Sequence, residues 1–134
     1  MTSLKTIEGI GSKNAEKLAR AGVRSVEALL EKGGKSKDRK VLSAESGVSD
    51  SQILEWVNRA DLFRIHGIGE EYSDLLEQAG VDTVVELSKR KADNLHAAMA
   101  RINAEKNLVN RMPSVGMVEG WIKEAKALPR AVEY

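Results

Sequence analysis

The sequence predicts an all-α protein in which one small helical module occurs twice. First, the pattern of residues 4–23 returns 58 residues further along the chain. Second, apolar residues recur every three to four positions between the turn signals, and no segment alternates apolar and polar residues as a strand would. The repeated positions are Ile7, Gly9, Ile10, Gly11, Leu18, Ala21, Gly22 and Val23, which return as Ile65, Gly67, Ile68, Gly69, Leu76, Ala79, Gly80 and Val81.

The first copy, residues 1–62, is predicted to hold about five short helices. Glycines stop several of these helices, because glycine adopts the left-handed conformation that ends a helix. Ser49 and Gln52 form a capping box that opens the fifth helix. No Gly or Pro interrupts the chain from there to His66, so we expect this helix to continue through residues 61–65 and to join the two copies rigidly. The predicted starts and stops are Ser3, Gly11, Gly22, Ser25, Gly33, Gly34, Gly47 and Ser49.

The second copy, residues 63–129, repeats this plan with about five helices of its own. Thr83 and Glu86 form another capping box. A longer helix is predicted from about Asp93 to Val109, and Pro113 prevents it from continuing further. The last helix carries Trp121 where the fifth helix carries Trp56, and both tryptophans are interpreted as core residues, as is Tyr72. Residues 130–134 are treated as a tail.

The amino-acid composition excludes several classes of protein. The 134 residues contain no cysteine, so disulfides and thiolate metal sites are excluded. There is no apolar run of membrane-spanning length and no signal-peptide pattern, so we expect a cytoplasmic protein without a membrane partner. Residues 1–60 carry 11 Lys and Arg against 8 Asp and Glu, and residues 61–134 carry 10 against 12. If one half meets phosphate, we expect it to be the first.

The two-glycine turn Gly9–Ile10–Gly11 is the main candidate site. Tight glycine turns leave backbone N–H groups open, and N–H groups at the start of a helix attract anions. Ser12, Lys13 and Lys17 follow on the same helix, with Lys5 beside its entrance, so this turn is predicted to hold phosphate groups. A purely structural turn is the alternative. The basic stretch of residues 35–40 is interpreted first as a solvated surface, with Lys37, Arg39 and Lys40 as further contacts if the turn binds a nucleic-acid backbone.

The second turn, Gly67–Ile68–Gly69, is predicted to be a weaker site. Glu70 and Glu71 follow it and repel phosphate, and Arg64 and His66 offset them only in part. We therefore favour a structural or protein-facing role for this turn. The basic cluster Lys89–Lys91 is interpreted as solvated surface.

No residue pattern predicts catalysis or a cofactor. His66 and His96 have no partner at metal-ligand spacing, so no metal site is expected. Gly11 is followed by Ser12 and Lys13, but the lysine is misplaced for a nucleotide-binding loop and no strand precedes the turn. We expect a protein that is not an enzyme.

Each copy resembles the N-terminal helix-hairpin-helix domain of archaeal and eukaryotic RecA-like recombinases. The first copy carries Gly-Ile-Gly-x-x-x-Ala-x-Lys-Leu-x-x-Ala-Gly, then Val-Glu-Ala-Leu, then Ser-Gly-Val-Ser before its last helix. The C-terminal domain of the bacterial RNA polymerase alpha subunit has a related shape. In these families the hairpin amides and nearby basic residues meet the DNA backbone, which implies the same contact here.

The whole chain, from Leu4 to about Leu128, is still more similar to a bacterial family of tandem helix-hairpin-helix modules of unknown function. The similarity lies in residues 56–62, 67–72, 94–96 and 104–106. It implies the tandem architecture and no activity. The predicted function is sequence-independent binding to nucleic acid, DNA rather than RNA, through the first turn. The alternative is an assembly module, in which the acidic second copy docks a protein, and both can hold together.

Overall fold

A computed structural model describes residues 2–134, which form eight α-helices, one 3-10 helix and no strand. The predicted all-α class is therefore confirmed. The chain forms two compact units: the first contains the residues up to Asp61 together with Ala131–Tyr134, and the second contains Leu62–Arg130. Among the described residues, no helix combines the length and the apolar character that crossing a membrane requires.

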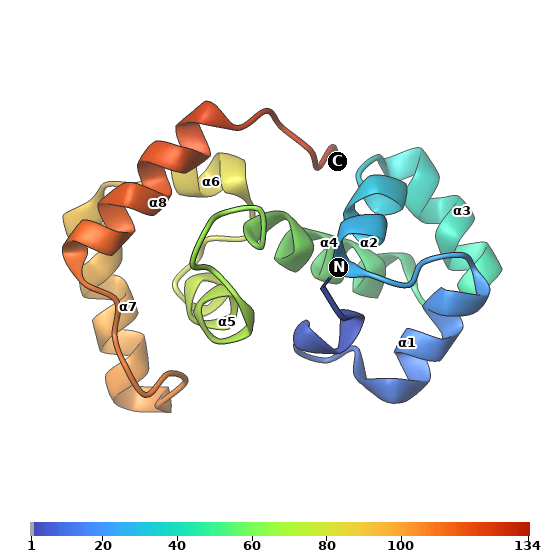
Figure 1. Cartoon of the computed structure of the whole chain (residues 1–134), viewed down its shortest axis with the longest axis horizontal. Helices are drawn as coiled ribbons and strands as arrows, with labels where there is room; N and C mark the ends of the chain where they lie inside the picture. Colours follow the sequence, from blue (N-terminus) through green and yellow to red (C-terminus); the bar gives the residue numbers. More distant parts are fainter. Residues whose placement is uncertain (1) are drawn as a thin grey trace. The chain divides into compact units, whose positions relative to one another are not determined.

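The first unit contains the 3-10 helix η1 and the helices α1 to α4 (Figure 1). The predicted caps are present: Ser25 Oγ accepts the Ala28 amide at 3.0 Å, Ser49 Oγ accepts the Gln52 amide at 3.2 Å, and Gly47 ends α3 with a φ of 78°. The elements are η1 (Leu4–Thr6), α1 (Gly11–Arg20), α2 (Val26–Gly33), α3 (Ser36–Ser46) and α4 (Asp50–Leu62).

The second unit contains α5 (Glu70–Gln78), α6 (Val84–Ser88), α7 (Ala92–Lys106) and α8 (Val115–Ala127). Thr83 and Ser114 cap α6 and α8 by accepting main-chain amides. The core of this unit is apolar and includes residues from each of its helices. Its fully or nearly buried members include Leu62, Ile65, Ile68, Leu75, Leu76, Val81, Val84, Leu87, Leu95, Met99, Val109, Val118, Trp121, Ile122 and Ala125.

The helix that was expected to continue into the second copy stops at Leu62. The Ile65 amide donates to the Leu62 carbonyl at 3.1 Å, the bond that Ile7 makes to Leu4 in the first unit. This turn directs Ile65 into the core of the second unit, where only 1% of it is exposed. The predicted continuation of this helix through residues 61–65 is thus wrong beyond Leu62, where a turn takes its place.

The predicted helix 93–109 is shorter at its C-terminal end than expected. It ends at Lys106, and Asn107 adopts the left-handed conformation with a φ of 49°. The Asn103 side chain then binds the main chain of Val109 through both of its polar atoms, at 2.9 and 3.1 Å. These bonds replace the next helical turn, so the helix ends well before Pro113.

Candidate functional site: the glycine turn of the first unit

The Gly9–Gly11 turn is held by buried residues on either side of its glycines. Ile7 and Ile10 are each 1% exposed, and the Ile10 amide donates to the Ile7 carbonyl at 3.3 Å. Gly9 and Gly11 have φ values of 91° and 63°, which only glycine adopts without strain. Both glycines are exposed. Of the predicted contact residues, Ile10 therefore anchors the turn, while the glycines present the backbone to solvent.

The N-terminus of α1 has neither a side-chain cap nor an acidic residue. Ile10 stands at the N-cap, and the first turn contains no Asp or Glu. The first amides of a helix have no partner within it, so they carry a partial positive charge. Ser12, Lys13 and Lys17 are all exposed on this helix. The start of α1 therefore presents donors and lysine charge on one exposed segment.

A tryptophan supports each glycine turn from inside its own unit. A Cβ atom on Gly9 would lie 3.6 Å from Trp56 Nε1, and one on Gly67 would lie 3.3 Å from Trp121 Nε1. Both tryptophans are less than 5% exposed, which confirms their predicted core role. The Tyr72 ring lies 5.4 Å from the Trp121 ring and packs against the same core.

The second turn resembles the first at its first glycine, but its second glycine and the residues that follow it differ. Gly67 has a φ of 88°, but Gly69 is extended with a φ of −121°, unlike Gly11. Glu70 and Glu71 are exposed in the first turn of α5.

The two basic side chains beside the second turn, Arg64 and His66, contact other residues of their own unit. Arg64 donates to the Pro129 carbonyl at 2.7 Å, and His66 Nδ1 lies 3.2 Å from Glu124 Oε2. The His66 amide also donates to Glu124, at 3.2 Å. These contacts tie the turn to α8 and to the segment after it. The basic side chains that are predicted to offset Glu70 and Glu71 therefore have other partners.

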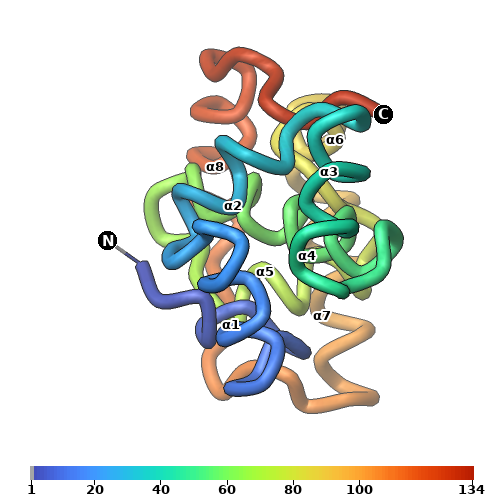
Figure 2. The backbone as a smooth tube through the Cα atoms, turned by 90° about the vertical axis from the view of Figure 1, so that its right-hand side faces the viewer, coloured from blue at the N-terminus to red at the C-terminus, as the bar shows by residue number. Residues whose placement is uncertain are grey.

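Lys37 and Lys40 are exposed, but they do not lie on the same surface as the Gly9–Gly11 turn and the start of α1. They belong to the N-terminal half of α3, and two views related by a quarter turn show the start of α3 at the opposite end of the first unit from the start of α1 (Figures 1 and 2).

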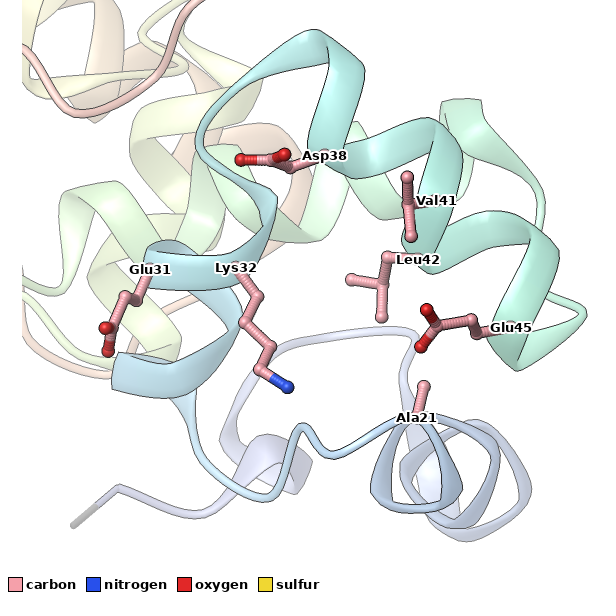
Figure 3. Close-up of a pocket in the computed structure, with 7 residues that line it drawn as sticks. All are labelled: Ala21, Glu31, Lys32, Asp38, Val41, Leu42 and Glu45. Carbon is pink, nitrogen blue, oxygen red and sulfur yellow. The ribbon is translucent and has the colours of Figure 1, made fainter.

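A groove of about 360 Å³ lies between the end of α1, α2 and α3 (Figure 3). Its charged lining residues are Glu31, Asp38 and Glu45 against Lys32.

The prediction that Arg39 is a further nucleic-acid contact is wrong, because its side chain is buried. It is only 3% exposed. Its guanidinium donates to the carbonyls of Gly33 and Gly34 at 2.9 Å and to that of Glu133 at 2.6 Å. Arg39 therefore holds the α2–α3 connection and the C-terminal segment together. The sequence pattern of alternating basic residues gives no sign of this burial, because the face of α3 that packs inward is defined by its neighbours.

The described residues contain no group of three or more His, Cys, Asp or Glu side chains placed to hold a metal ion. His96 is instead within hydrogen-bonding distance of the Pro113 carbonyl, at 2.9 Å.

A family model described as a domain of unknown function (DUF4332) matches residues 8–128. The matched range contains both glycine turns and all eight α-helices. No curated protein and no solved structure matches the chain.

Proposed function

Because the chain belongs to the DUF4332 family, whose description gives no activity, we propose a function from the geometry of the first unit: binding to the phosphate backbone of nucleic acid, without catalysis. We infer that both units are helix-hairpin-helix modules and that the first carries the binding activity. DNA is the expected ligand.

The carrying observation is the contrast between the starts of α1 and α5. Both helices follow a turn with a left-handed first glycine. The start of α1 has no carboxylate and exposes Lys13, whereas Glu70 and Glu71 occupy the same positions on α5. A phosphate is stabilised by the first arrangement and repelled by the second.

The contact involves few charges. The amides at the start of α1 and Lys13 hold one phosphate, and Lys5 or Lys17 reaches a neighbouring one. Such contacts do not read sequence. With about two to four phosphates neutralised, affinity is modest and decreases as salt rises. Lys37 and Lys40, at the other end of the unit, lie outside this contact.

Fluorescence anisotropy with a random-sequence DNA duplex and its single strand, at low and moderate salt, tests the proposal. Lys13→Glu is expected to weaken binding about tenfold or more, because it places a carboxylate at the start of α1. Lys37→Glu makes the same change of charge at the start of α3 and is the matched control, expected to change affinity less than about threefold. An RNA of the same sequence measures the preference for DNA.

Equal losses in Lys13→Glu and Lys37→Glu would indicate general electrostatic attraction and contradict a site at the turn. If the wild-type protein does not bind at low salt, nucleic-acid binding is wrong and the second candidate, a protein-assembly module, replaces it. That candidate is favoured by one observation: the start of α5 is acidic, and the neighbouring Arg64 and His66 contact other residues.

A further inference from the structure

The first unit contains a peptide segment that is neither helix nor strand, the C-terminal residues Ala131–Tyr134 of the same chain. The Glu133 amide donates to the Gly34 carbonyl at 2.7 Å, and Arg39 donates to the Glu133 carbonyl. Val132 is 2% exposed, so its side chain is anchored in the unit. The segment is therefore held by main-chain hydrogen bonds and one apolar side chain.

This docked segment lies between the start of α3 and the outer face of α4. A Cβ atom on Gly34 would lie 2.5 Å from the Ala131 carbonyl oxygen, so the segment passes directly over that glycine. Tyr134 lines a small hollow with Ser36 and Leu54, and its hydroxyl is 3.4 Å from Asn58 Oδ1. The first unit thus uses a groove between these two helices to hold a segment that is neither helix nor strand.

The second unit has a corresponding groove. Helices α4 and α8 each have 13 residues, and α8 begins 65 positions after α4. The N-cap residues of α3 and α7 are Lys35 and Lys91, 56 positions apart. At that spacing the buried Arg39 corresponds to the buried Leu95. The residues beside the docked segment, Gly34, Ser36, Leu54 and Asn58, correspond to Arg90, Ala92, Glu119 and Lys123.

These corresponding residues line an open groove of about 400 Å³. Its charges are Arg90, Lys91, Lys123 and Lys126 against Glu119. Arg90 also donates to the Ala79 carbonyl, at 3.4 Å. The three lysines are exposed, and no carboxylate of the described residues forms an ion pair with them. Ile122, 6% exposed, provides an apolar floor.

We propose that this cationic groove docks an extended acidic segment of a partner protein. The corresponding site in the first unit holds a peptide, and the lysines attract a negatively charged one. The apolar floor at Ile122 suits a side chain like Val132. Glu119 lies in the same lining, so the segment is expected to place its carboxylates beside the lysines and its apolar side chain at Ile122. This proposal uses residues other than those of the first turn and stands independently of nucleic-acid binding.

The test is anisotropy of a fluorescein-labelled, end-blocked peptide, Glu-Glu-Val-Glu-Glu, with the full chain at low salt. Saturable binding is expected, and the same peptide with lysine in place of glutamate does not bind. Lys91→Glu and Lys123→Glu, on two different elements, each weaken binding about tenfold. Arg101→Glu makes the same charge change at an exposed position of α7 outside the groove and alters affinity less than about twofold.

A second measurement maps the site directly. Amide chemical-shift changes on adding the peptide are expected in residues 90–92 and in the C-terminal half of α8. In the Lys13→Glu background, a ten-nucleotide oligothymidylate is expected not to displace the peptide.

Three results would overturn the proposal. They are no peptide binding up to about 1 mM, equal weakening by Arg101→Glu, and displacement of the peptide by the oligonucleotide, which would identify a nucleic-acid groove.

Discussion

Gly9 and Gly67 each lie against the indole nitrogen of a tryptophan from the last helix of their own unit. The left-handed φ of each glycine explains why no side chain is present at either position, and at Gly67 a Cβ atom would also lie only 3.3 Å from the Trp121 indole nitrogen. The exposed backbone of the first turn, on which the proposed function depends, is thus fixed from the core side. A residue that contacts no ligand therefore positions the residues proposed to do so.

Arg39 illustrates how strongly a single residue's environment sets its role. It is a basic residue in a basic stretch, yet it donates to three main-chain carbonyls and is nearly inaccessible. Leu95 at the corresponding position of the second unit is also fully buried. The additional task of Arg39 is to hold the C-terminal segment, which has no counterpart in the second unit.

Replacing Arg39 with leucine is expected to lower the free energy of unfolding of the first unit by about 2 kcal/mol, because buried carbonyls lose charged donors while the side-chain volume is kept in part. Urea unfolding followed by Trp56 fluorescence, in a Trp121→Phe background, measures the loss. Lys40→Leu, on the exposed side of the same helix, is the control and should change stability by less than about 0.5 kcal/mol. Equal effects of the two substitutions would contradict the role assigned to Arg39.

At the level of elements, α1 and α5 start at the same kind of two-glycine turn, but their first helical turns differ in charge. Gly11 is left-handed and Gly69 is extended, so the amides that follow the two glycines are presented differently. The carboxylates of Glu70 and Glu71 stabilise α5 through its dipole, which α1 does without. The first turn of α1 gives up that stabilisation and gains an exposed positive end.

Placing the residues that follow Gly11 after Gly69 tests whether these charges determine DNA binding. The double variant Glu70→Ser/Glu71→Lys reproduces the Ser12–Lys13 pair. It is expected to raise DNA affinity about threefold to tenfold at low salt and to steepen the salt dependence. The control is Glu55→Ser/Glu105→Lys, which makes the same change in net charge at exposed helical positions elsewhere. An equal gain in the control would mean that net charge alone controls affinity.

At the level of the whole molecule, the chain passes between the units twice, after Asp61 and after Arg130. The first unit is therefore completed by residues from the far end of the chain. Each unit also holds one buried tryptophan, so the stability of the two units can be followed separately.

Deleting residues 131–134 is expected to destabilise the first unit by about 3 kcal/mol, because it removes the buried Val132 side chain and the hydrogen bonds of Glu133. The unfolding midpoint reported by Trp56 should decrease, and the midpoint reported by Trp121 should not change. The single-tryptophan variants Trp121→Phe and Trp56→Phe provide the two signals. A midpoint that decreases equally in both would show that the units unfold as one body.

The sequence by itself determined the all-α class, the glycine turns, most helix caps and the core tryptophans. These features depend on local backbone preferences and on apolar periodicity, which neighbouring residues encode. The end of α4 and the end of α7 were less predictable, since an Ile65 side chain drawn into a core and an Asn103 bridge to Val109 decide them.

Only the tertiary structure decided which charged residues belong together. It buried Arg39 and engaged Arg64 and His66 with α8 and the segment after it. It also brought Lys91 and Lys123, which are far apart in the sequence, to one groove. The physical reason is that charge in a sequence gives the sign of each side chain, whereas its direction and its neighbours depend on contacts between distant segments. For this protein, the glycine turns depend on local sequence and were predictable, whereas the charged surfaces around them were not.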